Sequence, residues 1–166
     1  MNKMYLICGM PGAGKTTYAT KFVKEHNIKY YFNIDNFYDA FCGRGGHKFE
    51  VWQAFFSAIH SVENEDEDIV VETMSLTTYN RQELLHWFPD FEHILIYISA
   101  PYDLCCENNN KRVRVVPDAI LKDYYNKMEV PSPWLDIGWE VRFVINNNNE
   151  FVECEDGLRW EKHYTL

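Results

Sequence analysis

The sequence has no hydrophobic run that approaches the roughly 18 residues of a membrane-spanning helix. The apolar segment after Lys3 is too short for the core of a signal peptide. None of the five cysteines forms a C-x-x-C pair, and the six histidines show no zinc-ligand spacing. We therefore expect a cytoplasmic protein with no membrane partner and no zinc site, whose cysteines are reduced and mostly buried.

Basic charge is also scarce, since 16 lysines and arginines face 25 acidic residues and the formal net charge is −9. A nucleic acid bound along its length would select a basic face. The acidity is concentrated, however: residues 63–72 hold six acids and no base, and residues 129–166 carry −5, whereas residues 1–62 carry +3. The charge therefore argues against extensive nucleic-acid contact, but it allows a short end held at a few phosphates.

The chain has 166 residues, of which 46% are hydrophobic, so it can build a core without disulfides. Short apolar runs predict strands at 3–8, 30–32, 69–71, 93–98 and 141–145. Apolar residues at helical spacing predict helices at about 14–26, 51–62, 78–88 and 117–128. This alternation predicts an α/β three-layer sandwich around a mostly parallel five-stranded sheet. No internal repeat interrupts the chain, so we expect residues 1–166 to form one domain with an acidic strand or extension at about 139–166.

The segment Gly9–Thr16 satisfies the pattern G-x-x-x-x-G-K-[ST] in full, after a predicted strand and at the start of a predicted helix. Its glycines let successive backbone N–H groups surround phosphate oxygens, and the helix adds the positive end of its dipole. Lys15 would contact the β- and γ-phosphates of a nucleotide, and the Thr16 hydroxyl would complete a Mg²⁺ shell. The predicted nucleotide-binding residues here are Gly9, Pro11, Gly12, Ala13, Gly14, Lys15, Thr16 and Thr17.

Two acidic residues follow predicted strands, at the edge of the sheet where ligands of such folds bind. Asp35 follows the second strand and can accept the proton of an attacking hydroxyl group, or it can cap the next short helix. Glu72 ends the third strand and is expected to hold a Mg²⁺-bound water or to position Thr73, unless it is an ordinary acid at a strand end.

A cluster of cations, Lys111, Arg112 and Arg114, lies between two predicted helices. Arginines on a mobile loop stabilise the charge that develops during phosphoryl transfer, and their planar fork suits this better than a lysine. We expect a small helical lid at about residues 105–117, in which Arg112 first and Arg114 second bind the nucleotide; a solvated charge run is the alternative. The glycine-rich loop around Arg44 could contact the acceptor or form only a turn.

With these elements, the chain resembles, from about Met4 to Val130, the P-loop kinase domain of phage-type polynucleotide 5′-hydroxyl kinases and related small AAA-type kinases. The resemblance implies the P-loop NTPase fold, ATP and Mg²⁺ held through Lys15 and Thr16, and Asp35 as the catalytic base. It also matches Arg112, in a Lys-Arg pair ahead of a Val-Pro helix start, to a lid arginine.

The chain departs from the family pattern at several positions. Glu72-Thr73-Met74 stands where the family has Asp-Thr-Asn, an element that positions the substrate, so only the threonine is retained. Tyr38 replaces an arginine that grips the phosphate of the acceptor, and the upstream lid arginine falls near Asn108. These departures weaken the case for an oligonucleotide acceptor more than the case for phosphoryl transfer.

We therefore expect a Mg²⁺-dependent phosphotransferase that moves the γ-phosphate of ATP, or of another NTP, to a hydroxyl group. A short single-stranded polynucleotide 5′-hydroxyl end is the favoured acceptor, contacted by Asp35, Tyr38, Arg44 and Thr73. Two alternatives stay open. One is a kinase of a small molecule such as a nucleoside, nucleotide or drug, which Tyr38 favours. The other is an NTP-binding or NTP-hydrolysing module without an acceptor, which would need neither Asp35 nor an arginine lid.

Overall fold

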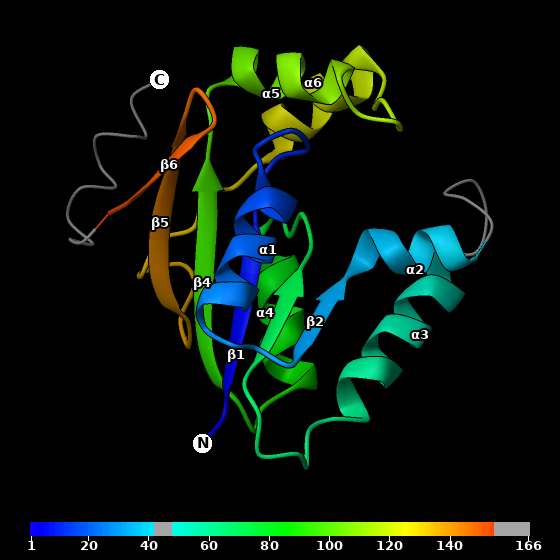
Figure 1. The fold of residues 1–166 in the computed structure, drawn as a ribbon, viewed down its shortest axis with the longest axis vertical. Helices are drawn as coiled ribbons and strands as arrows, with labels where there is room; N and C mark the ends of the chain where they lie inside the picture. Colours follow the sequence, from blue (N-terminus) through cyan, green and yellow to red (C-terminus); the bar gives the residue numbers. More distant parts are fainter. Residues whose placement is uncertain (42–47, 155–166) are drawn as a thin grey trace.

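The computed structural model describes residues 1–41 and 48–154. In chain order (Figure 1) the elements are β1 Lys3–Cys8, α1 Lys15–Glu25, β2 Tyr30–Asn33, α2 Ile34–Ala40, α3 Lys48–His60, β3 Ile69–Glu72, α4 Thr78–Trp87, β4 Glu92–Ser99, α5 Tyr102–Asn110, α6 Asp118–Lys127, β5 Glu140–Asn147 and β6 Glu150–Glu153. Within these two ranges, every helix is too short or too polar to cross a membrane.

The strands form one sheet in the order β2-β3-β1-β4-β5-β6. Neighbouring strands from β2 to β5 are parallel, and β6 runs antiparallel to β5. The predicted α/β fold with a mostly parallel sheet is confirmed, and each of the five expected strands is present. The sheet has one further strand, β6, because Asn148 and Asn149 adopt positive φ angles and turn the chain back onto β5.

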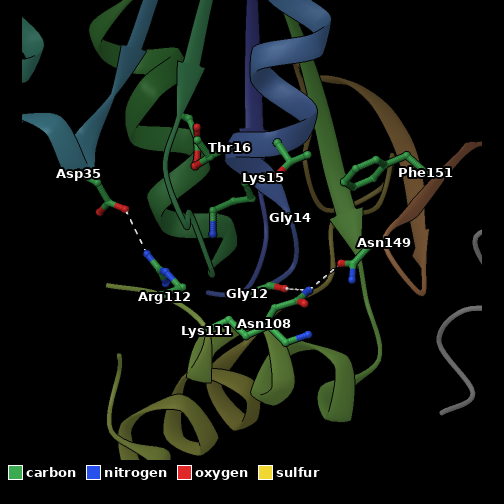
Figure 2. Close-up of a pocket in the computed structure, with 12 residues that line it drawn as sticks. Gly12, Gly14, Lys15, Thr16, Asp35, Asn108, Lys111, Arg112, Asn149 and Phe151 are labelled. Atoms are coloured by element: carbon green, nitrogen blue, oxygen red, sulfur yellow. Dashed lines mark hydrogen bonds and ion pairs between the residues drawn. The ribbon is translucent and has the colours of Figure 1, made fainter. Parts of the chain in front are cut away.

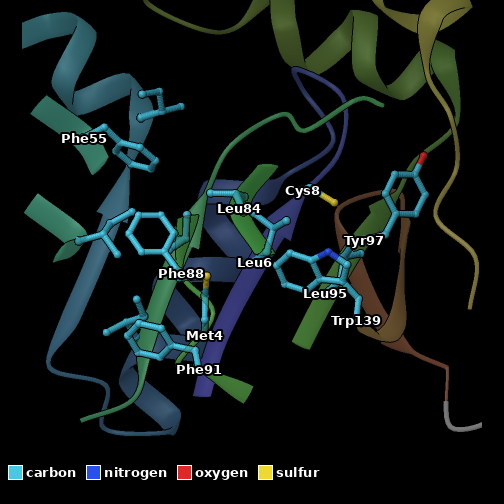
Figure 3. Close-up of a cluster of buried hydrophobic side chains, with 14 of the residues drawn as sticks. Met4, Leu6, Cys8, Phe55, Leu84, Phe88, Phe91, Leu95, Tyr97 and Trp139 are labelled. Atoms are coloured by element: carbon cyan, nitrogen blue, oxygen red, sulfur yellow. The ribbon is translucent and has the colours of Figure 1, made fainter. Parts of the chain in front are cut away.

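Helices cover both faces of this sheet (Figure 1). On one face α1 packs through Tyr18, Ala19 and Phe22 against apolar side chains of β1, β3 and β4. On the other face α3 contributes Phe55 and Ile59, α4 contributes Leu84, and Phe88 follows directly after α4; these side chains form a cluster with Met4, Leu6 and Leu95 (Figure 3). Phe55 is fully buried, and Trp52 and Phe56 of the same helix pack against this cluster, so these three aromatic side chains of α3 belong to the core. Burial on both faces explains why the central strands are almost continuously apolar.

The carboxyl ends of the parallel strands meet at one edge of the sheet. The turn after β1 leads into α1, β2 leads directly into α2, and β3 ends at Glu72. Helices α5 and α6 lie beyond this same edge (Figure 1). The topology therefore brings four segments that are distant in sequence to a single end of the molecule, where ligands of such sheets bind.

Candidate active site

The loop between β1 and α1 turns at glycines that no other residue could replace without strain. Gly12 and Gly14 have φ angles of 80° and 96°, in the left-handed region. A Cβ atom on Gly12 would lie 2.3 Å from the carbonyl oxygen of Cys105 in α5. The loop therefore runs directly against α5. Gly14 is the N-cap residue of α1, so the free backbone amides at the start of this helix lie at the loop.

Lys15 is the first residue of α1, and its side chain folds back over the loop. Its Nζ donates to the carbonyl oxygens of Gly9 and Met10, each at 2.9 Å. Burial lowers the pKa of Lys15, and the nearby charges of Glu72 and Asp35 oppose this shift. The ammonium is thus held over the phosphate-binding loop by the backbone of the loop itself.

Thr16 and Glu72 meet at the base of the site. The Thr16 hydroxyl donates to Oε1 of Glu72 at 2.6 Å, and Glu72 is only 2% exposed. Hydroxyl and carboxylate oxygens are the hard ligands that Mg²⁺ prefers, and Mg²⁺ commonly keeps several waters beside one or two protein oxygens. This pair of donors fits a magnesium ion bound together with nucleotide phosphates.

A cleft with a volume of about 390 Å³ opens over the loop (Figure 2). Two sides of it differ in character: Asp35 and Arg112 lie on one side of Lys15, and Asn149 and Phe151 lie on the other. The residues that line the cleft are Gly12, Gly14, Lys15, Thr16, Thr17, Asp35, Glu72, Asn108, Lys111, Arg112, Asn149 and Phe151.

Asp35 lies in the first turn of α2, and its backbone N–H donates to the side chain of Asn33, the residue that caps the helix. The residue that caps α2 is therefore Asn33 and not Asp35. The Asp35 carboxylate instead forms an ion pair with Arg112, with 3.6 Å between Oδ2 and Nη2. Arg114 forms a second ion pair, with Asp39 one turn further along α2. The predicted lid segment is thus joined to α2 by two cation–carboxylate contacts.

Other predicted site residues lie beside the cleft without lining it. Thr73 is buried, and its hydroxyl bonds to that of Ser75. Tyr38 accepts a hydrogen bond from Nε1 of Trp52 at 3.1 Å and packs against the core. Of the loop residues, those that line no part of the cleft are Gly9, Pro11 and Ala13. Arg44 lies outside the described residues.

The β5–β6 hairpin supplies two cleft residues, Asn149 and Phe151, that the sequence pattern did not indicate. Asn108 donates to the Gly12 carbonyl at 3.0 Å and to Oδ1 of Asn149 at 2.9 Å. The buried Asn146 donates to the Ala13 carbonyl at 2.8 Å. An asparagine run at a turn is typical of any hairpin, so only its contact with the loop identifies it as part of this site.

Comparison with known proteins finds a sequence relative and solved structures of similar fold. L-seryl-tRNA(Sec) kinase of Methanococcus maripaludis is 24% identical over 169 residues, which cover 93% of this chain and 63% of the relative. The chain therefore spans less than two thirds of that relative. A sugar kinase from Janibacter sp. HTCC2649 superposes with a TM-score of 0.64 at 18% identity over 86% of both chains. A chain of the Pnkp1/Rnl/Hen1 RNA repair complex has a TM-score of 0.69 at 13% identity, over 76% of this chain and 43% of that one.

A family model described as an AAA domain (AAA_33) matches residues 4–131, which is most of the chain and includes the phosphate-binding loop, α2, β3 and the arginine segment. The solved structures share the same α/β architecture. The chain therefore belongs to this AAA-domain family, and its fold is that of the P-loop kinases.

Proposed function

We propose that the protein is an ATP-dependent phosphotransferase that transfers the γ-phosphoryl group to a hydroxyl acceptor. The observation that carries the proposal is the convergence of Lys15, Thr16, Asp35 and Arg112 on one cleft. Lys15 and the loop amides suit phosphate, Asp35 suits a hydroxyl proton, and Arg112 suits the charge of the transition state. A module that only binds or hydrolyses NTP would need neither of the last two.

The asymmetry of the cleft supports one orientation of the nucleotide. With phosphates at Gly12–Thr16, the γ-phosphate points toward Asp35 and Arg112, since these are the acid and the cation opposite the hairpin (Figure 2). The nucleoside then lies toward Asn149 and Phe151, where amides and an aromatic ring can contact a base and a ribose.

Thr16 and Glu72 would hold the magnesium ion, Thr16 directly and Glu72 through a bound water. When bound, the ion neutralises charge on the β- and γ-phosphates. Lys15 adds its charge to the same phosphates, and its contact with two loop carbonyls keeps it in place before the nucleotide arrives.

The transfer itself follows from these positions. The acceptor oxygen forms a bond to the γ-phosphorus while the bond from that phosphorus to the β–γ bridging oxygen breaks. ADP leaves with the electron pair, and the hydroxyl proton passes to Asp35. Arg112, in the lid that we propose at residues 105–117, releases Asp35 and donates to the γ-phosphoryl oxygens, which it stabilises as charge spreads over them.

For the acceptor we propose a short single-stranded polynucleotide 5′-hydroxyl end. The similarity to a kinase whose name specifies seryl-tRNA and to a chain of an RNA repair complex supports an RNA-borne hydroxyl group. The distribution of charge supports contact with only a few phosphates, because residues 1–62 carry +3 and the acidity lies elsewhere.

A small-molecule acceptor is the second candidate, and the contacts around α2 favour it. Tyr38 stands where an acceptor-binding arginine is expected, and its hydroxyl is engaged by Trp52. Arg114 is paired with Asp39. The absence of an arginine at position 38 and the pairing of Arg114 both leave less positive charge for an acceptor phosphate. The similarity to a sugar kinase points the same way.

A panel of acceptors tests these proposals. Purified protein is incubated with γ-labelled ATP and Mg²⁺, together with 5′-hydroxyl oligonucleotides, 5′-phosphorylated oligonucleotides as matched controls, nucleosides or sugars. We expect label on the 5′-hydroxyl oligonucleotides and none on the 5′-phosphorylated ones. Label on a nucleoside or sugar alone would establish the second candidate. Release of inorganic phosphate with every acceptor, and no labelled acceptor, would contradict phosphotransfer.

A further inference from the structure

The carboxylate of Glu72 is held by three side chains from two directions. Its Oε1 accepts from the Thr16 hydroxyl at 2.6 Å. Its Oε2 accepts from the Tyr31 hydroxyl and from Nδ2 of Asn33, the latter at 3.1 Å. Glu72 and Asn33 are 2% and 6% exposed, so both lie away from bulk water.

The register of the sheet explains how the two residues of β2 reach Glu72. Strand β2 pairs in parallel with β3, so that Asn33 lies opposite Glu72 and Tyr31 lies opposite Val70. Side chains two residues apart on a strand share a face. Tyr31, Asn33 and Glu72 therefore point toward the α1 side of the sheet, where Thr16 lies in the first turn of the helix.

The two oxygens of the Glu72 carboxylate therefore have different partners. Oε2 is occupied by Tyr31 and Asn33, whereas Oε1 accepts from Thr16, which lines the cleft together with Glu72. A glutamate has one more rotatable bond than an aspartate, so its carboxylate needs more restraint to keep one orientation.

We propose that Tyr31 is a positioning residue for magnesium–nucleotide binding, which fixes the Glu72 carboxylate so that Oε1 and the Thr16 hydroxyl face the metal shell together. The inference rests on the proposed function of the cleft. Groups that orient a metal ligand from behind commonly affect metal affinity about 10-fold or more. Tyr31 acts through Glu72 and lines no part of the cleft itself.

The neighbouring Tyr30 offers a matched control. Its hydroxyl also donates to a glutamate, Glu65, in an exposed contact, while its ring packs against the core cluster on the other face of the sheet. Tyr30 lies at the amino end of β2, opposite Ile69, whereas Glu72 lies at the carboxyl end of β3. Tyr30→Phe and Tyr31→Phe remove the same atom from consecutive residues of one strand. A loss that came only from weakening the edge strand would appear in both variants, whereas loss of metal positioning would appear in Tyr31→Phe alone.

The test measures binding of a fluorescent ATP analogue while MgCl₂ is titrated, and again in EDTA. We expect Tyr31→Phe to raise the half-saturating Mg²⁺ concentration about 10-fold, with the affinity in EDTA unchanged. Tyr30→Phe should leave both values at those of the wild type. An unchanged Mg²⁺ titration for Tyr31→Phe would overturn the proposal.

Two further variants keep the result interpretable. Asn33→Ser retains a helix-capping oxygen but removes the amide donor to Glu72, so it should shift the Mg²⁺ titration in the same direction even if Tyr31→Phe folds poorly. In a Glu72→Asp background the shorter carboxylate no longer reaches Tyr31, so adding Tyr31→Phe should have no further effect. If the nucleotide affinity of the wild-type protein did not change with Mg²⁺ concentration, that result would instead count against the proposed function of the cleft.

Discussion

Arg112 and Asp35 form an ion pair across the mouth of the cleft, with 3.6 Å between Nη2 and Oδ2. The pair joins the segment after α5 to the first turn of α2, two parts of the chain that the sheet topology alone does not connect. Both side chains are about one third exposed, so water screens the attraction and the pair is easily exchanged for a better partner. In the function that we propose, a γ-phosphate for Arg112 and an acceptor hydroxyl for Asp35 are such partners.

Replacement of Arg112 should slow the chemical step. We expect Arg112→Ala to lower kcat about 10²- to 10³-fold, because a donor aimed at the developing charge is lost. Arg142→Ala removes an arginine that is similarly paired, with Glu140, but on β5 away from the cleft. It should change kcat less than about 2-fold, as expected for an exposed pair. Steady-state rates at saturating ATP measure both, and equal rates for Arg112→Ala and the wild type would contradict the assignment.

The buried lysine predicts a dependence of nucleotide binding on alkaline pH. Burial lowers the pKa of Lys15 below its ordinary value of 10.5, so its charge is lost at a lower pH than that of an exposed lysine. Because the charged form binds phosphate, ATP affinity should fall as the pH rises toward 10.5. Lys15→Arg keeps its charge and should lack this component of the decline. The measurement is ATP affinity between about pH 7 and about pH 10 for both proteins.

The lowered pKa of Lys15 has the opposite effect on the pH dependence of stability: ATP affinity falls as the pH rises, but the contribution of Lys15 to the free energy of unfolding increases. Its pKa is lower in the folded chain, so between the folded and unfolded values the unfolded chain binds more protons. This contribution to the free energy of unfolding therefore increases as the pH rises through that window. If the Lys15 contribution to stability fell together with ATP affinity as the pH rose, the lowered pKa would be wrong.

The contact of the loop with α5 predicts that Gly12 is intolerant of a side chain. Gly12→Ala would place a Cβ atom 2.3 Å from a backbone carbonyl of α5 at a φ of 80°, so the loop or the helix must move. We expect at least about a 10-fold loss of ATP affinity. Gly138→Ala has a comparable φ of 96°, but it meets only the flexible end of Leu85 at 3.0 Å. It should cost about 1 kcal/mol of stability and leave ATP affinity unchanged, as measured by titration and thermal unfolding.

Most of the fold was predictable from the sequence, because the burial of each strand and helix determines where its apolar residues lie. The central strands are covered on both faces and therefore appear as apolar runs, and the glycine-rich loop fixes where the first helix begins. Strand β6 was missed because it is short and mostly exposed, so neither its length nor its apolar content marks it. Its position is set by the turn at Asn148 and Asn149 instead.

The site was only partly predictable for a related reason. Some site residues have side chains suited to phosphoryl transfer and lie at the ends of predicted strands and helices. Residue type and sequence position were therefore enough to predict that they line the cleft, as Lys15, Thr16, Asp35, Glu72 and Arg112 do. Tertiary contacts, by contrast, decide the remaining residues. Tyr31 and Asn33 gain their contact with Glu72 from the register of β2 on β3. The hairpin residues gain theirs from a turn that lies far along the chain from the loop that it contacts.

A buried ion pair behind the site should contribute strongly to stability. Arg81, which is 1% exposed, donates to both oxygens of Asp136 and to the carbonyl of Ser75. Arg81→Met leaves the Asp136 carboxylate buried without its cation, which costs about 3–5 kcal/mol. Arg142→Met, at an exposed pair, should cost less than about 1 kcal/mol. Urea unfolding of both variants measures the difference, and similar losses in the two would contradict a structural role for the buried pair.

The central claim is that Asp35 takes the proton of a hydroxyl acceptor over bound ATP. Single-turnover transfer from γ-labelled ATP, together with the ATP dissociation constant, tests it in Asp35→Asn and in the control Asp123→Asn, which alters an exposed carboxylate paired with Lys127. We predict that Asp35→Asn binds ATP within about 2-fold of the wild type and transfers phosphate at least about 10²-fold more slowly, while Asp123→Asn is normal on both counts. Transfer by Asp35→Asn at the wild-type rate would contradict it.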